Sequence, residues 1–229
     1  MLIKLKKYLG IGKLNKITTL MYHYVRNIKN SAYPNIKGLE LNLFKEQIKY
    51  LKKFYTFINY NDLIESIYHS KKIKKNSIIL TFDDGFVDNY KFVFPVLVKE
   101  NVKACFFPIA STIIENKVAD VHKIHFILEN ISNLEILKKE TKTIINYLEK
   151  NRIIKQNYSE IYTNLAVKNE DDNKDVVFFK RLFQHYLDPN IRSEILKKLF
   201  FKYVTDNEKE FSNKLYLSLD NIKEMSKYG

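Results

Sequence analysis

Two adjacent carboxylates, Asp83 and Asp84, are the residues of this sequence best suited to chemistry. They follow the apolar run IILTF (78–82), which predicts a strand buried on both faces, and they precede Gly85. Successive side chains of a strand point to opposite faces, so the two acids can do different work. One can bind a divalent cation, whose charge offsets their mutual repulsion, while the other accepts a proton. The alternative is that the two acids form a turn and a helix N-cap, which is what Asp-Asp-Gly without further context favours.

Strands and helices must alternate around this pair if it stands at the end of a core strand. The patterns predict strands over 16–25, 55–60, 76–82 and 103–110, and helices over 41–54, 61–70 and 87–102. We expect Asn61 to cap the second helix, Asp88 or Asn89 to cap the third, and Pro95 to kink or restart it. Such alternation indicates a parallel sheet or an α/β barrel.

The pattern changes after residue 110. Residues 111–213 are polar with helical apolar spacing, and KNEDDNKD (168–175) is predicted to be a solvated linker. Residues 214–229 restart with a short apolar element and a helix capped by Ser218 or Asp220. We therefore divide the chain into a basic N-terminal segment (1–15), a first α/β part (16–110), a helical insertion (111–213) and a return to the α/β part (214–229).

Three stretches together resemble a known family. LTFDDGFVDNYKFVFPVLVKENVKACFF (80–107) is similar to the first motif and following helix and strand of the polysaccharide deacetylase family (carbohydrate esterase family 4, the NodB homology domain). LMYHYV (20–25) resembles the family's opening strand, and LSLDNIKEMSKYG (217–229) the helix before its second motif.

The resemblance implies an α/β fold: the N-terminal part of a deformed, TIM-like (β/α) barrel of the NodB type, carrying a large helical insertion. It implies Asp83 as the catalytic base and Asp84 as a ligand of a divalent metal, with zinc expected. The implied activity is hydrolytic removal of acetyl from an N-acetylated carbohydrate, which is free, lipid-linked or polymeric.

The second family motif, His-Ser/Thr-x-x-His, has no counterpart in this sequence, nor has the later Leu-x-x-His that supplies the catalytic acid. Zinc sites use about four ligands, at least three of them from protein. We therefore expect the chain to be incomplete or inactive by itself, with metal binding dependent on the missing histidines. The alternative is a non-catalytic relative that binds glycan or anionic partners.

Histidines elsewhere offer two further candidate positions. His23 follows the first predicted strand and would line the rim of the site. His122, His125 and Glu129 fall at i, i+3 and i+7 of a predicted helix and could in principle bind a metal. We favour the alternative that these residues bind no metal, with His125 packed against apolar neighbours and His122 at the surface.

Charge and composition narrow the partners. The 229 residues carry a formal net charge of +13, but the lysines are scattered and no nucleic-acid motif accompanies them, so we expect no specific nucleic acid. The basic N-terminal segment MLIKLKKYLGIGKL (1–14) could lie on a membrane surface. The favoured prediction is a frayed terminus. A secretory signal and an apolar run of about 20 residues are both missing, which predicts a cytoplasmic protein with peripheral membrane contact at most. The one cysteine, Cys105, is expected to be a buried thiol.

Overall fold

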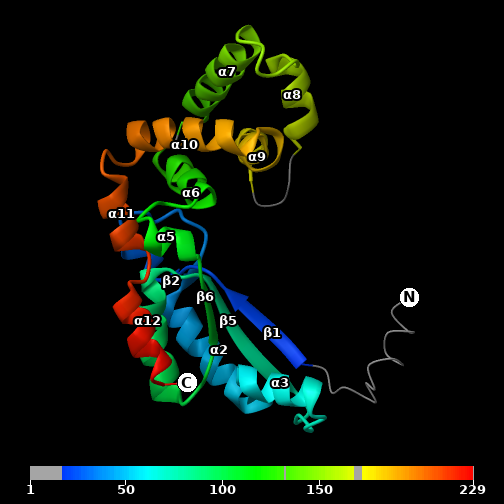
Figure 1. The fold of residues 1–229 in the computed structure, drawn as a ribbon, viewed down its shortest axis with the longest axis vertical. Helices are drawn as coiled ribbons and strands as arrows, with labels where there is room; N and C mark the ends of the chain where they lie inside the picture. Colours follow the sequence, from blue (N-terminus) through cyan, green and yellow to red (C-terminus); the bar gives the residue numbers. More distant parts are fainter. Residues whose placement is uncertain (1–16, 132, 168–171, 229) are drawn as a thin grey trace, which may run out of the picture. The chain divides into compact units, whose positions relative to one another are not determined.

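The computed structural model describes residues 17–131, 133–167 and 172–228 (Figure 1). The chain forms two compact units, Met1–Glu115 with Asn213–Gly229 and Asn116–Ser212. We call the first the α/β unit and the second the helical unit. The basic segment 1–15 that the sequence singles out lies outside the described residues.

The α/β unit contains short strands and the helices between them. Its elements are β1 (Ile17–Tyr22), β2 (Val25–Arg26), η1 (Ile28–Asn30), β3 (Leu39–Glu40), α2 (Leu41–Phe54), β4 (Thr56–Phe57), α3 (Tyr60–Tyr68), β5 (Ser77–Asp84), η2 (Asn89–Val93), α4 (Phe94–Glu100), β6 (Cys105–Pro108), α5 (Ala110–Ile114) and α12 (Leu219–Ser226).

β5 is the central strand of the main sheet, and all its partners run parallel to it. β1 pairs along one edge, from Ile17 beside Ser77 to Tyr22 beside Phe82. On the same sheet, β4 pairs with the start of β5 and β6 with its end. A second sheet joins β2 to β3. The parallel α/β architecture is thus confirmed, whereas the described residues form no closed barrel.

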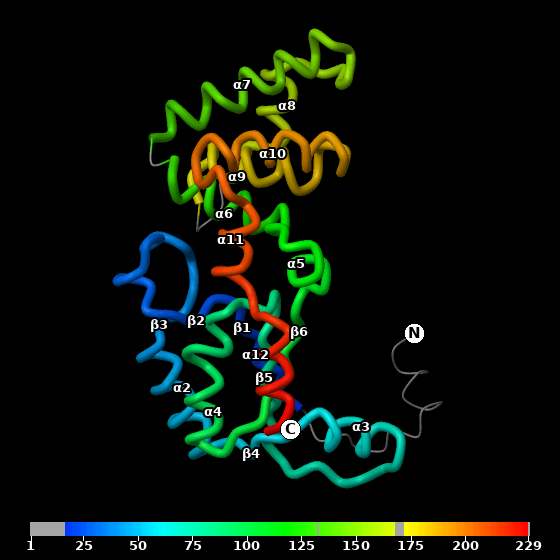
Figure 2. The backbone as a smooth tube through the Cα atoms, turned by 60° about the vertical axis from the view of Figure 1, so that its left-hand side comes forward, coloured from blue at the N-terminus to red at the C-terminus, as the bar shows by residue number. Residues whose placement is uncertain are grey.

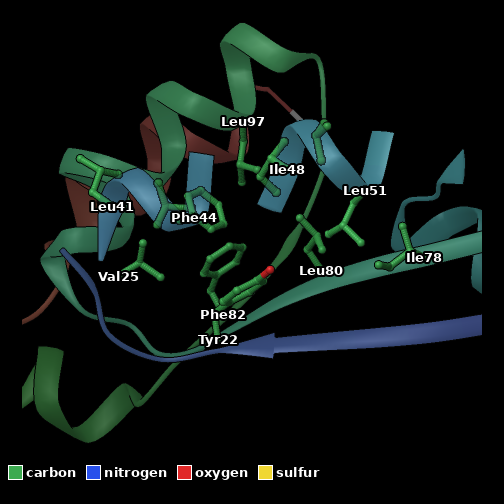
Figure 3. Packing of buried hydrophobic residues seen from close by; sticks show 12 residues of the cluster. Tyr22, Val25, Leu41, Phe44, Ile48, Leu51, Ile78, Leu80, Phe82 and Leu97 are labelled. Atoms are coloured by element: carbon green, nitrogen blue, oxygen red, sulfur yellow. The ribbon is translucent and has the colours of Figure 1, made fainter. Parts of the chain in front are cut away.

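One face of the sheet packs against α2 and α4 (Figure 3). The helical spacing of α2 places Phe44, Ile48 and Leu51 on one side, and all three are buried. Phe82 of β5 stacks on Tyr22 of β1 with ring centroids 5.0 Å apart. Burial of each such side chain contributes about 1.5–3 kcal/mol, so this cluster holds β5 in place.

The opposite face of the sheet is more open. Met21 and Phe107 on this face expose 59% and 52% of their surface. Asp83 shares this face because it is the neighbour of the inward-pointing Phe82. Cys105 lies on the same face. The sequence predicts a buried thiol, whereas Cys105 is half-buried. This partial burial raises the pKa of the thiol.

The described part of the helical unit contains helices only. Its elements are α6 (Asp120–Asn130), α7 (Leu134–Lys150), α8 (Tyr158–Leu165), α9 (Lys174–Arg181), η3 (Leu182–Tyr186), α10 (Pro189–Tyr203) and most of α11 (Glu208–Leu215). Its core is rich in phenylalanine, with Phe178, Phe179 and Phe200 almost fully buried.

Several local predictions need correction. Asn59, not Asn61, caps α3, through a capping box with Asp62. The predicted linker 168–175 ends inside α9, where Asp175 is buried, and its residues 168–171 lie outside the described residues. Pro95 does restart a helix, because a π-helical turn, η2, precedes α4 and the proline sits in the first turn of α4. Ser218 caps α12, as predicted.

Candidate functional site

Asp83 and Asp84 are the last two residues of β5, at the carboxyl edge of the parallel sheet (Figure 1). They lie beside Phe107 and Pro108 of β6, and both are half-buried. Carboxyl ends of parallel strands are where open α/β sheets place their binding sites. Both residues therefore retain some exposure to solvent.

The backbone turns sharply immediately after Asp83. Asp84 has φ 69° and Gly85 has φ 66°, so two consecutive residues adopt the left-handed conformation. A Cβ at Gly85 would lie 2.6 Å from the Pro108 Cβ and 2.8 Å from its Cα, so only glycine fits. A non-glycine residue in this conformation costs about 1 kcal/mol or more, and such strain concentrates at functional sites. β5 therefore ends at Asp84, where the chain turns out of the strand.

The chain segment before α12 closes on this turn. Leu217 donates its backbone N–H to the Gly85 carbonyl at 2.8 Å, and Phe86 forms an antiparallel bridge with Tyr216. Residues far apart in sequence are therefore fixed together at the site, and Figure 2 shows α12 continuing alongside α4 and β6.

Aromatic rings stack on Phe86, two residues after Asp84. Phe86 is fully buried and stacks on Tyr24 with ring centroids 4.0 Å apart, and on Tyr216 at 6.0 Å. Burial raises the pKa of the Tyr24 hydroxyl, and the nearby charge of Asp84 raises it further while Arg26 lowers it. Tyr24 is thus a protonated hydroxyl within electrostatic reach of Asp84.

Asp88 does not cap the following helix, contrary to the sequence prediction. Its side chain accepts from Arg26, with Nε 2.6 Å and Nη2 2.5 Å from Oδ2, and both side chains are largely buried. Burial raises the pKa of Asp88, and Arg26 opposes that rise. The other predicted cap, Asn89, is fully buried, and its amide atoms have no hydrogen-bond partner among the described residues. The pair of Arg26 and Asp88 instead ties β2 to the turn that carries the site.

Sequence reasoning missed Tyr24, Arg26 and Tyr216. Tyr24 lies in the quoted stretch LMYHYV, so an aromatic residue beyond the strand end was a usable signal. Arg26 and Tyr216 carry no local signal, because they meet the site only through tertiary packing.

His23 follows β1 directly and is exposed. Since Tyr22 pairs with Phe82, the register puts His23 at the same edge of the sheet as Asp83. Within the described ranges, however, no group of three His, Cys, Asp or Glu side chains is placed to hold a metal ion. The carboxylate pair and His23 by themselves therefore do not fit the set of ligands that zinc requires.

The helical unit does not supply such a set either, within its described residues. His122 and His125 lie on α6 with ring centroids 5.9 Å apart. His122 is 1% exposed, which corrects the expectation of a surface residue. Because its neighbour Lys123 is also buried, against Glu208 at 2.9 Å, this side of α6 is part of the packing of the helical unit.

An apolar groove of about 390 Å³ lies between α4, β6 and α12. Pro108 and Leu217, which both contact Gly85, belong to its lining, but no acid and no histidine among the described residues does. The groove therefore adjoins the turn, and its described lining supplies neither a carboxylate nor an imidazole.

Comparison with known proteins places this geometry in context. Residues 70–142, which include β5 and the carboxylate pair, match the family model of polysaccharide deacetylases. This part of the chain is related to the polysaccharide deacetylases. YxkH of Bacillus subtilis (strain 168), whose name marks it as a candidate polysaccharide deacetylase, is 29% identical over 99 residues. That match covers 43% of this chain and 33% of YxkH, so the chain spans about one third of that relative.

Three solved structures are also similar to parts of this chain. A de-N-acetylase from Aggregatibacter actinomycetemcomitans is 24% identical, covering 42% of this chain and 38% of that one, with a TM-score of 0.38. IcaB from Ammonifex degensii is 25% identical, covering 44% and 42%, with a TM-score of 0.38. The Streptococcus pyogenes deacetylase PplD is 19% identical over 72% and 80%, with a TM-score of 0.37. TM-scores below 0.5 do not establish a common overall fold. Among the described helices, none has the length and apolar character to cross a bilayer.

Proposed function

We propose that this chain is a deacetylase-like hydrolase that acts on an N-acetylated carbohydrate with the help of a divalent metal. One observation carries the proposal: the stretch that matches the polysaccharide deacetylases contains two half-buried carboxylates at the carboxyl end of the central strand. The resemblance assigns Asp83 as the base and Asp84 as a metal ligand. His23 is proposed to line the rim, and the sheet is proposed to be the first part of a barrel.

Amide hydrolysis requires water to add to the acetyl carbonyl while a base takes a proton from that water. Asp83 suits this role because a carboxylate is a competent proton acceptor and this one stands at the carboxyl end of the central strand. The C–N bond then breaks, the amine nitrogen takes up a proton, and acetate leaves. None of the described residues at the site is assigned the task of protonating the amine.

The metal is the part of the proposal that the described residues do not satisfy. Asp84 would supply one ligand, whereas a zinc site takes at least three ligands from protein. No such set of side chains is present in the described ranges. We therefore propose that the remaining ligands and the acid come from groups beyond this arrangement. The proposed domain scheme follows: an α/β part over 16–110 and 214–229, interrupted by a helical insertion over 111–213.

The proposed function is tested by acetate release from N-acetylglucosamine oligomers in the presence of zinc. The chain is assayed alone and after co-expression with the C-terminal part of a related deacetylase, which carries the His-Ser/Thr-x-x-His motif. We expect little or no release by the chain alone and release in the co-expressed assembly that Asp83→Asn abolishes. Release that persists in Asp83→Asn would contradict the proposed base.

A non-catalytic glycan-binding role is the second candidate, favoured by the lack of a three-ligand group in the described residues. This role predicts that the chain alone and the co-expressed assembly both bind N-acetylglucosamine oligomers without hydrolysing them. Lipid-linked or polymeric substrates and the cytoplasmic location expected from the sequence stay predictions.

A further inference from the structure

Helix α3 presents an apolar face that is covered only in part. At 100° per residue, Tyr60, Leu63, Ile64, Ile67 and Tyr68 fall within one arc of this nine-residue helix. None of its residues is buried, and Tyr60, Ile67 and Tyr68 expose 53%, 56% and 74% of their surface. Leu63 and Ile64 of this arc are half-buried, so its exposed part consists of Tyr60, Ile67 and Tyr68. Exposed apolar side chains gathered on one helix face mark an interaction site more often than scattered apolar residues do.

Four lysines lie in the segment KKIKK (71–75), which begins three residues after the last residue of α3, and all four are exposed. The segment is anchored at both ends. Lys71 donates its backbone N–H to Glu65 O at 3.3 Å, and the Ser77 hydroxyl donates to Lys74 O at 2.8 Å. Asp62 lies 3.3 Å from the Lys71 ammonium, so one of the four charges is offset by an ion pair. Glu65 is a second acid on α3, so four lysines stand against two acids and the net charge is +2. The surface formed by α3 and residues 71–75, the α3–lysine surface, is therefore both apolar and basic.

The α3–lysine surface stands at the end of the sheet where β1 begins, because Ile17 pairs with Ser77, two residues after the lysine segment. Figures 1 and 2 both draw α3 at the end of the sheet where β1 starts.

This surface lies at the opposite end of β5 from the carboxylates. β5 runs from Ser77 to Asp84, and a strand rises about 3.3 Å per residue, so the two ends are about 23 Å apart. A partner at the α3–lysine surface would leave Asp83 and Asp84 open.

We propose that the α3–lysine surface docks the protein onto an anionic lipid bilayer. Its apolar side chains would enter the boundary between headgroups and acyl chains, while the lysines lie at the level of anionic headgroups. A soluble polyanion would use the lysines but gives no role to Ile67 or Tyr68. A second copy of the chain, docked through the same surface, would bring lysines against lysines, which is unfavourable.

The test is sedimentation of the full chain with vesicles of phosphatidylcholine, with or without about one third phosphatidylglycerol, at an ionic strength of about 0.1 M. We expect binding to the anionic vesicles only. The pair Ile67→Ser with Tyr68→Ser should lower the partition coefficient about tenfold or more, because the apolar anchor is lost. The triple variant Lys72→Gln, Lys74→Gln, Lys75→Gln should lower it by a similar factor.

Matched controls separate surface chemistry from total charge. Lys139→Gln, Lys142→Gln and Lys150→Gln remove the same charge from α7, and Phe201→Ser removes an apolar side chain that is 65% exposed. These variants should bind anionic vesicles as the wild type does. Equal loss in the controls, binding to neutral vesicles, or a lipid-free dimer that Ile67→Ser with Tyr68→Ser dissociates would each overturn the proposal. Circular dichroism of every variant excludes unfolding as the cause of lost binding.

Discussion

Asp83 and Asp84 illustrate how two neighbouring residues of the same type can be given different surroundings. Asp83 continues the pleat of β5, whereas Asp84 adopts a left-handed conformation and the chain turns after it. Gly85 makes the turn possible because Pro108 leaves no room for a side chain. The different backbone conformations of the two residues are thus consistent with the proposed roles of Asp83 as base and Asp84 as ligand.

Arg26 and Asp88 provide the first stability prediction. Replacing Arg26 with Met should lower the free energy of unfolding by about 3 kcal/mol at neutral pH, because Asp88 would be left buried without its cation. Burial already raises the pKa of Asp88 with Arg26 present, and the variant should raise it further. The loss should therefore shrink as the pH falls through this raised pKa, since the folded state then holds a neutral carboxyl group.

Urea denaturation at neutral and acidic pH measures this effect. Lys71→Met breaks an exposed ion pair of the same unit, with Asp62 at 3.3 Å, and should change stability by about 0.5 kcal/mol or less. An Arg26→Met loss that stays constant with pH would show that Asp88 is not the residue left unpaired.

At the scale of elements, the sequence predicts most where one periodicity dominates. The predicted range of α2 is the range found, because Phe44, Ile48 and Leu51 give an unambiguous helical period. The apolar run of β5 and the Ser218 cap are also local signals, and both predictions are confirmed.

The missed features depend on tertiary partners. Asp88 looks like a cap until Arg26, 62 residues earlier, is brought beside it. Asp175 lies in a charged stretch that resembles a linker, yet it is buried between Tyr162 and Lys138. His122 is buried because its side of α6 faces the rest of the helical unit, which no local pattern reveals.

Tyr162 joins α8 to α9 and gives the second stability prediction. Its hydroxyl donates to Asp175 at 2.7 Å, and this hydrogen bond, with burial, raises the pKa of Tyr162 from 10.0 to about 12. Between these values the unfolded chain loses the proton first, so the free energy of unfolding should fall as the pH rises from about 10 to about 12. Tyr162→Phe should lower stability by about 1–2 kcal/mol below this range and remove that part of the pH dependence.

Denaturant titrations of the wild type and Tyr162→Phe over alkaline pH provide the measurement. Tyr147→Phe removes a hydroxyl from a tyrosine that is 62% exposed, and its stability curve should match that of the wild type. Identical alkaline slopes for the wild type and Tyr162→Phe would refute the assignment.

At the scale of the whole molecule, the proposed functions use different parts of the α/β unit. The carboxylates stand at one end of β5, and the α3–lysine surface stands at the other. The carboxylates and the α3–lysine surface lie at opposite ends of the sheet. Every described strand that pairs with β5 runs parallel to it, so the carboxyl ends of these strands share one edge. Membrane docking and deacetylation can therefore be tested independently.

The zinc dissociation constant of the co-expressed assembly tests the central claim, the division of labour between the two acids, most directly. Asp84→Asn should weaken zinc binding by about tenfold or more, because a ligand is lost. Asp83→Asn should leave the constant within about threefold of the wild type and yet abolish acetate release, because only the base is lost. Equal zinc affinities for the wild type and Asp84→Asn, or a larger loss in Asp83→Asn, would contradict the assignment.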